Sequence, residues 1–297
     1  MNRNTAEEIT NRILGDLEKG VAPWEKPWKQ GQGLTLPVNA CTKKPYRGIN
    51  IVELWNDAAR KGYTFPSFVT FNQARELGGN IRKGQHGTQV IFYKRIPKEK
   101  NLRLEVPEDE IETLPEDQTF MVLRTYTVFN LDQTEGLDHL KPKLDPVEPF
   151  KALEEAERIL RDSGARIFHT ALDKALYNPT EDHIVLPFKE SFKSPEAYYG
   201  TALHELTHWT GHESRLNREK GKRYGDQAYA FEELVAEMGA AFLCASVGIP
   251  YATRHSDYIG DWIQVLKDHK RAIFSAAAKA QAAMDFVLKT KFVEAVA

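Results

Sequence analysis

A chain of 297 residues, with 41% hydrophobic and 28% charged side chains, has the composition of a globular protein that forms one large domain or two ordinary ones. The polar N-terminal stretch predicts no signal peptide, and no apolar run approaches the roughly 20 residues that span a bilayer. Two cysteines far apart in the chain, Cys41 and Cys244, are typical of a reducing compartment. We therefore expect a cytoplasmic protein with no membrane partner.

The net charge of −2 combines two parts of opposite sign. Residues 1–104 contain 18 Lys and Arg against 9 Asp and Glu, whereas the remaining 193 residues contain 22 against 33. A basic part of this kind is typical of a surface that meets a polyanion. The asymmetry therefore indicates nucleic acid as a partner of the N-terminal part.

The first predicted element is an amphipathic helix over residues 5–19, which ends at Gly20. Residues 23–29 follow, and their prolines exclude a long helix. Trp24 and Trp28 alternate there with lysines, an arrangement in which indoles stack on bases while ammonium groups meet phosphates. The alternative is that the same indoles fill the hydrophobic core, and the sequence leaves both interpretations open.

Further basic residues surround two predicted helices, over about 49–61 and 70–77. A glycine-rich turn at 80–87 follows and leads into a strand at 88–95. Between Arg82 and Arg103 there are seven basic residues and one acid, with aromatic side chains among them, as in grooves that bind single strands. A solvated basic hairpin is the alternative. The predicted DNA contacts are Trp24, Trp28, Lys43, Lys44, Arg47, Arg82, Lys83, His86, Tyr93, Lys94 and Arg95.

A second strand is predicted over residues 120–129, where side chains alternate, and it should pair with the strand at 88–96 in an antiparallel sheet. Three prolines between residues 142 and 149 then indicate an extended linker. The expected division is a basic N-terminal domain over residues 1–138, a linker over 139–149 and a second domain over 150–297.

The second domain begins with a predicted helix over residues 150–163, followed by short strands at 166–170 and 182–187. The next helix should begin at the cap Ser194 and stop at Gly211. It carries the motif H-E-x-x-H, in which both histidines lie on one face, one turn apart. Two imidazoles so placed bind one zinc ion, and the acid reaches the water that the ion holds. The motif residues are His204, Glu205 and His208.

A zinc ion of this kind needs a third protein ligand, for which the sequence offers His212, Glu233 and Glu237. His212 lies beyond the predicted end of the helix. The two acids lie on one face of a predicted helix around residues 229–242, among small side chains that let a neighbouring helix approach. We expect Glu233 to bind the metal and Glu237 to hydrogen-bond a ligand histidine, whereas Glu232 should point elsewhere.

The predicted site would hold Zn²⁺, or another divalent ion such as Mn²⁺, with Glu205 as the general base. An oxyanion partner is also expected, and Tyr224, Tyr229 and His212 are unranked candidates. Residues 255–291 carry apolar side chains at helical spacing and predict helices that cover the core.

Together these motifs resemble the ArdC antirestriction proteins of conjugative plasmids and the similar N-terminal region of TraC-type plasmid primases. The residues that carry the resemblance are 23–28, 48–50, 83–94, 126–130, 204–212 and 232–237. The resemblance implies an α+β protein with two domains. The first is an α+β single-stranded-DNA-binding domain with a small antiparallel sheet, and the second a mainly helical zincin-like metallopeptidase domain with a small sheet. It also implies a role in protecting incoming plasmid DNA from host restriction.

Two other functions fit the same residues. A metallopeptidase could cleave a protein substrate, such as a host restriction protein, that the basic domain recruits. Alternatively, the metal could be purely structural, so that Glu205→Gln changes nothing whereas a chelator unfolds the second domain. All the residues that the motif needs for catalysis are present, which favours an enzymatic role over a purely structural metal.

Overall fold

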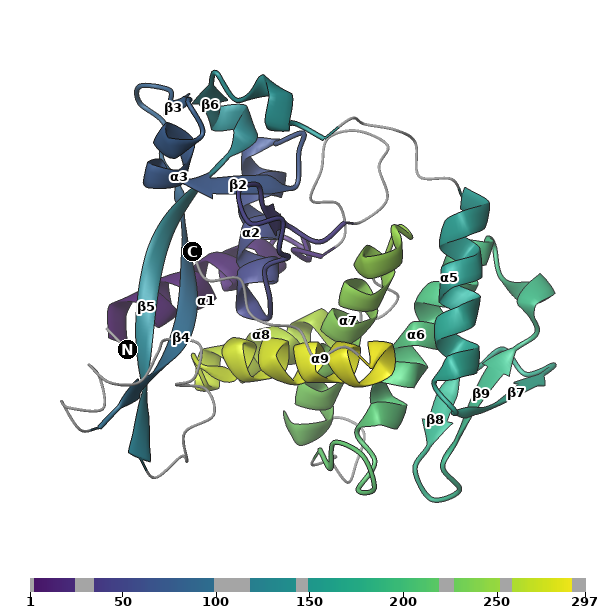
Figure 1. Cartoon of the computed structure of the whole chain (residues 1–297). Coiled ribbons are helices and arrows are strands. Elements are labelled where there is room, and N and C mark those ends of the chain that lie inside the picture. Colours follow the sequence, from purple (N-terminus) through teal and green to yellow (C-terminus); the bar gives the residue numbers. More distant parts are fainter. Residues whose placement is uncertain are drawn as a thin grey trace.

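The computed structural model describes residues 3–24, 35–98, 118–142, 149–218, 227–251 and 258–289. Figure 1 shows the N-terminal strands and helices on one side, α5 and a small sheet on the other, and the C-terminal helices between them. The mixture of helices and small sheets confirms the predicted α+β class.

The elements follow the predicted ones closely, apart from several short strands that no sequence pattern indicated. The N-terminal elements are α1 (Arg3–Leu17), β1 (Val38–Asn39), α2 (Ile49–Lys61), β2 (Ser67–Thr70), α3 (Phe71–Glu76), β3 (Asn80–Ile81), β4 (Thr88–Pro97), β5 (Thr119–Asn130), η3 (Leu131–Gln133), β6 (Thr134–Glu135) and η4 (Asp138–Leu140). The C-terminal elements are α5 (Pro149–Asp162), β7 (Arg166–Thr170), β8 (Leu176–Asn178), β9 (His183–Pro187), η5 (Lys189–Ser191), α6 (Pro195–Thr210), α7 (Gln227–Val247), α8 (Ile259–Asp268) and α9 (Ala272–Leu288).

The N-terminal sheet has the strand order β1-β2-β5-β4. Strand β4 pairs antiparallel with β5 along its whole length, from Thr88 opposite Val128 to Pro97 opposite Thr119, which confirms the predicted antiparallel pairing. Helix α2 covers the outer edge of β4, because the Asn50 amide donates to the Ile91 carbonyl (2.7 Å) and accepts from the Ile91 N–H (2.8 Å). These two hydrogen bonds satisfy backbone groups of β4 that would otherwise be unpaired at the edge of the sheet.

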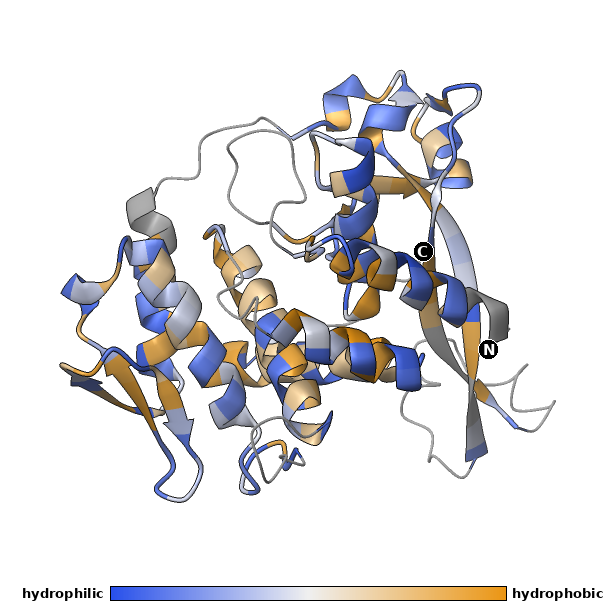
Figure 2. Ribbon diagram, turned by 180° about the vertical axis from the view of Figure 1, so that it is seen from behind, coloured by the Kyte–Doolittle hydropathy of each residue, from blue (hydrophilic) through white to orange (hydrophobic). Residues whose placement is uncertain are grey.

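The hydrophobic core continues from the N-terminal helices into the C-terminal ones. The indole of Trp24 meets that of Trp262 edge-on at 5.9 Å, and Trp55 meets Phe242 at 5.8 Å. Figure 2 shows broad hydrophobic stretches along the central helices and the strands of the small sheet. Residues separated by about two hundred positions along the chain therefore share one core.

Helix α7 lies at the centre of the C-terminal part and is buried on all sides from Glu232 to Ala245. A helix surrounded by other helices in this way presents no solvent face. Beside α5 and α6 lies a sheet of order β7-β9-β8, in which β7 and β9 are parallel and β8 forms an antiparallel edge.

The predicted linker, residues 139–149, begins within η4, and its positions 143–148 lie outside the described residues. The domain limits therefore stay a prediction. Within the described parts of the chain, none of the helices is long and apolar enough to cross a membrane.

Candidate metal centre

Helix α6 begins and ends where its sequence predicts. The Ser194 hydroxyl accepts a hydrogen bond from the Ala197 N–H (3.2 Å), and Pro195 occupies the first helical position, where its missing N–H costs nothing. The helix ends at Thr210, and Gly211 follows with an ordinary φ of −79°. Gly211 is needed for space, since a Cβ there would lie 2.8 Å from the Arg218 guanidinium.

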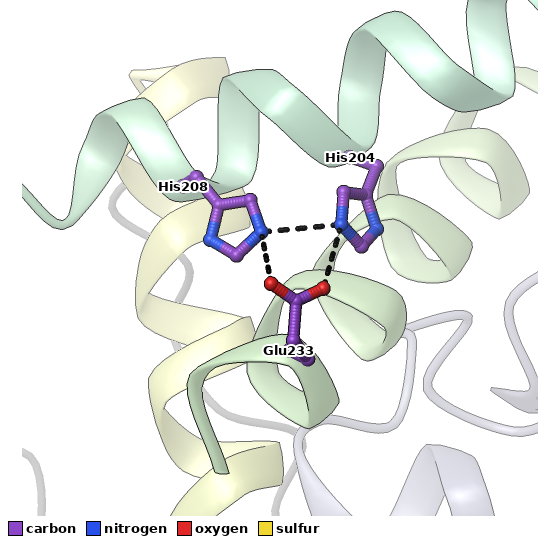
Figure 3. Close-up of side chains that lie close together, drawn as sticks. All are labelled: His204, His208 and Glu233. Carbon is purple, nitrogen blue, oxygen red and sulfur yellow. Dashed lines mark hydrogen bonds and ion pairs between the residues drawn. The ribbon is translucent and has the colours of Figure 1, made fainter. Parts of the chain in front are cut away.

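His204, His208 and Glu233 point at one another from α6 and α7 (Figure 3). The two Nε2 atoms are 3.1 Å apart, and each lies 3.4 Å from a different oxygen of the Glu233 carboxylate. Tetrahedral ligands about 2.1 Å from a zinc ion are separated by about 3.4 Å, so the three side chains fit such an ion. Among the described residues, they are the one group of His, Cys, Asp or Glu close enough to do so.

The approach of α7 to α6 depends on Gly239. A Cβ at this position would lie 2.5 Å from the Cγ2 of Thr207, so no larger residue fits without movement. Thr207 directly precedes His208 on α6, and Gly239 follows Glu237 by two residues on α7, so the contact lies next to the residues of the site. Sequence reasoning stressed the small side chains beside the acids and missed this glycine, although Gly inside a long helix is itself a sign of close packing.

Glu232 also faces the site, and the prediction that it points elsewhere is wrong. Its Oε1 atom lies 3.3 Å from Nδ1 of His208, on the far side of the ring from Glu233. The carboxylate is held by the Arg218 guanidinium, which donates from Nη2 to Oε1 (2.8 Å) and from Nε to Oε2 (3.0 Å). Because α7 has no solvent face, a helical wheel could not exclude this direction.

Arg218 is anchored by α6 itself. It donates to the Thr207 carbonyl (2.6 Å) and to the Thr210 hydroxyl (2.7 Å) and is only 6% exposed. The guanidinium therefore fixes Glu232, and Glu232 fixes the ring of His208. Nothing in the sequence pointed to Arg218, because it lies in the irregular segment after Gly211.

Glu237 lies beside the other histidine. Its Oε1 atom is 3.9 Å from Nδ1 of His204, and its Oε2 atom accepts a hydrogen bond from the Tyr251 hydroxyl (2.6 Å). Both carboxyl and phenol are buried. Glu237 therefore lies beside His204 at more than hydrogen-bond distance, so its role in orienting the ring stays a prediction, and Tyr251 supports its carboxylate.

The carboxylates favour positive charge at the site. Burial alone would lower the pKa of His208, but the contacts with Glu232 and Glu233 outweigh it and raise the pKa to about 10. Burial would raise the pKa of Glu233, but its contacts with the two histidines hold that pKa well below its usual range. For His204, burial dominates and lowers the pKa. The same carboxylates would stabilise a divalent cation between the two histidines, and its binding would displace protons from the imidazole rings.

The remaining predicted residues of the site differ in their positions. Glu205 is buried next to His204. Burial, the Glu233 contact and the charge of Glu205 raise the pKa of Tyr229 to about 12, although Tyr258 opposes this, so Tyr229 belongs to the site's surroundings. His212 is half-buried, and its Nδ1 atom lies 2.8 Å from the Ser214 hydroxyl oxygen, apart from the three ligands. Tyr224 lies outside the described residues.

Two of the predicted DNA contacts are engaged elsewhere. Trp24 is fully buried against Trp262, which contradicts the prediction that its indole stacks on bases and supports the alternative, a core side chain. Arg47 forms an ion pair with Asp285 of α9.

The other predicted DNA contacts differ in how far the structure describes them. Lys43, Lys44, Arg82, Lys83 and His86 are all exposed. Trp28 lies outside the described residues. The side chains of three further predicted contacts on β4 lie outside the described part of the structure, namely those of Tyr93, Lys94 and Arg95.

Comparisons with known proteins match both parts of the chain. A model for the N-terminal domain of the anti-restriction factor ArdC matches residues 3–129, and a model for a zincin-like metallopeptidase matches residues 154–279. Solved structures of the antirestriction ArdC protein from plasmid R388 match 96% of this chain and 97% of theirs. The metal-free form is 38% identical with a TM-score of 0.77, and the Mn(II)-bound form is 37% identical with a TM-score of 0.76. The chain belongs to the ArdC antirestriction family.

Longer and uncharacterised relatives match as well. The DNA primase TraC of Escherichia coli is 39% identical over 289 residues, and the match spans 95% of this chain but 20% of the primase. A second TraC primase is matched over 27% of its length. The uncharacterised protein y4eC of Sinorhizobium fredii is 35% identical, with 95% of this chain and 90% of that protein covered.

Proposed function

We propose that α6 and α7 hold a divalent metal ion, zinc or manganese, through His204, His208 and Glu233, in a hydrolytic site. The observation that carries the proposal is the convergence of two ring nitrogens and one carboxylate at the spacing of tetrahedral ligands. The Mn(II)-bound form of the R388 relative supports it. When bound, such an ion polarises a carbonyl and lowers the pKa of a coordinated water.

The chain's own residues would perform the remaining tasks. Glu205 follows His204 on the same buried helix and would take the proton of the attacking water as general base. Glu232 and Glu237 would hold the two imidazoles by their Nδ1 atoms, so that both Nε2 atoms face the ion. A peptide bond is the substrate class that a zincin-like domain suits, with a host protein as the source.

The metal proposal is tested by calorimetric titration of chelator-treated protein with Zn²⁺ and Mn²⁺. Wild-type protein and the Glu205→Gln variant should each bind one ion, because Glu205 is not a ligand, whereas Glu233→Gln should bind far more weakly. Equal affinity in the Glu233→Gln variant would remove Glu233 from the ligand set. Loss of peptide hydrolysis in Glu205→Gln, with metal binding intact, would separate catalysis from a structural metal.

We also propose that the N-terminal part binds single-stranded DNA and thereby protects incoming plasmid DNA from restriction. Membership of the ArdC family and the basic excess of residues 1–104 support this role. The affinity for single strands should fall steeply with salt and exceed that for duplex. A transfer assay into a restricting recipient then compares wild-type and Glu205→Gln protein. Equal protection by both would show that protection runs through DNA binding rather than hydrolysis.

A further inference from the structure

A hollow of about 520 Å³ lies in the N-terminal part, among segments that are far apart in the sequence. Three cations line it: Lys61 at the end of α2, Arg82 just after β3, and Lys141 just after η4. Asp132 of η3 is its one lining carboxylate, and Tyr63 and the amides of Gln85 and Gln133 also line it. Figure 1 shows β3 and β6 together at this end of the molecule.

The cations are positioned by ordered backbone rather than by chance exposure. Helix α2 ends at Gly62, whose left-handed φ of +66° lets its N–H bond to the Ala58 carbonyl and leaves Lys61 on the last turn. The backbone N–H of Arg82 donates to the Gln133 carbonyl (2.9 Å). Three separate segments therefore carry their positive charges to one hollow.

The present partners of these cations are exchangeable. Lys61 pairs with Asp57 at 3.0 Å and donates to the His86 carbonyl (2.9 Å), and Lys141 pairs with the exposed Asp138 at 2.6 Å. Arg82 donates to a backbone carbonyl, that of Asp132. Exposed pairs of this kind contribute about 0–1 kcal/mol, so an anion can replace them at little cost. The Asp132 carboxylate accepts the Thr64 N–H (2.5 Å), which keeps it engaged with backbone.

The amides add neutral donors. Gln133 accepts the Asn130 N–H (2.9 Å) with its oxygen and donates with its nitrogen to the Gln85 oxygen (3.1 Å) and to the His86 carbonyl (2.9 Å). Since its oxygen accepts this bond, Gln85 presents its NH₂ group as a donor to whatever enters the hollow. Donors and cations thus dominate the lining, which suits a phosphate group and the acceptor atoms of a base.

We propose that this hollow binds a phosphate of single-stranded DNA, together with its nucleotide, through Lys61, Arg82 and Lys141. The proposal rests on the DNA-binding function proposed above and assigns that function to a particular site on the N-terminal part. The volume is in the range of sites that take small ligands. A flexible single strand can bend one nucleotide into a concave site, whereas duplex DNA, with its persistence length of about 50 nm, cannot.

The test measures binding of a fluorescein-labelled oligothymidylate by anisotropy, over a series of salt concentrations. The variants are Lys61→Gln, Arg82→Gln and Lys141→Gln, singly and combined. Each lost phosphate contact on a single strand should reduce the salt slope by about 0.7, which corresponds to about a fivefold loss of affinity at 0.1 M salt. Lys61→Arg should retain binding, because it keeps the charge.

A matched triple variant controls for net charge: Lys174→Gln, Lys189→Gln and Lys267→Gln in the C-terminal part. Two of these lysines, like Lys61 and Lys141, form surface ion pairs, with Glu157 and Glu18. If the hollow variants bind like wild type, or the control triple weakens binding as much as the hollow triple, the assignment is overturned while DNA binding itself stands. If wild-type protein fails to bind single strands, the proposed function itself fails.

Discussion

The metal centre and the basic hollow use polar side chains in opposite ways. At the metal centre, the ligands stand on two long helices that touch through Gly239, and the supporting side chains Glu232, Glu237 and Arg218 are buried. At the hollow, the cations lie at or just beyond the ends of elements, and Lys61 and Arg82 are themselves exposed. In a buried network, the loss of any one member lowers stability strongly because its partners are left without hydrogen bonds. Exposed charges contribute nearly independently of one another. The two regions should therefore respond to substitution in different magnitudes and with different additivity.

The largest effect is expected for Arg218→Met. The substitution leaves the Glu232 carboxylate buried without its guanidinium, which should lower the free energy of unfolding by about 3–5 kcal/mol. Urea denaturation measures this loss. The double variant Arg218→Met/Glu232→Gln should recover a large part of it, because the orphaned charge is gone. A single variant as stable as wild type would show that the network does not behave as a buried unit.

Glu232→Gln should act mainly on metal binding. The amide keeps the shape of the carboxylate but is a weaker acceptor for the Nδ1–H of His208, and loss of such a partner typically weakens metal affinity about 10–100-fold. Calorimetric titration measures the change, with Glu154→Gln on the surface of α5 as control. Unchanged affinity in Glu232→Gln would mean that Arg218 and Glu232 stabilise the fold without orienting the ligand.

Gly239→Ala tests the contact between the two helices. Overpacking costs about 1–3 kcal/mol, partly offset by about 1 kcal/mol of helix propensity, so a net loss of about 1 kcal/mol is expected in thermal or urea unfolding. Gly260→Ala in α8 is the matched control, since a Cβ there has nothing within 4 Å and should not destabilise. Thr207→Ser removes the methyl group nearest to the new Cβ and should restore part of the stability of Gly239→Ala. A Gly239→Ala variant as stable as Gly260→Ala would contradict the close approach.

Asp182 gives a smaller, pH-dependent effect near the end of α6. Hydrogen bonds from Arg215 outweigh burial and lower the pKa of Asp182 to about 2. Because the folded-state pKa lies below the unfolded value of about 3.9, the contribution to stability is present above pH 4 and lost as the pH falls towards 2. The side chain is 34% exposed, so the contribution should be about 1 kcal/mol or less.

Asp182→Asn should therefore be less stable than wild type at pH 7, and the difference should shrink between pH 4 and pH 2. Urea denaturation over this range measures it. Asp162→Asn, which breaks an exposed pair with Arg161, is the control and should show no such dependence. A constant difference between Asp182→Asn and wild type at all pH values would contradict the role of the charge.

The smallest effect on folding is expected at the hollow. Lys61→Gln, Arg82→Gln and Lys141→Gln should each change the free energy of unfolding by no more than about 0.5 kcal/mol, since their pairs are at the surface. Their effects on DNA affinity should multiply, in contrast to the non-additive pair at Arg218 and Glu232. Strong destabilisation by any one of these variants would show that the side chains of the hollow, like those of the metal centre, form a coupled network.

Local sequence signals determined the elements that carry the chemistry. Ser194, Pro195 and the glycine after Thr210 delimit α6, and the four-residue spacing of His204 and His208 places both rings on one face, because the helical period alone sets that geometry. The alternating side chains of β4 and β5 likewise determined their pairing. The small side chains around Glu233 indicated which helix approaches α6.

Tertiary structure alone decided which groups surround those elements. The helical period relates positions on α7 to one another, but it cannot say which faces meet protein when all of them do, so the direction of Glu232 was missed. Arg218 reaches the site from an irregular segment, and Lys61, Arg82 and Lys141 meet only because the fold brings the end of α2 and the segments after β3 and η4 to one hollow. Trp24 could stack on a base or fill a core with the same local sequence, and burial against Trp262, which lies far along the chain, decided the matter.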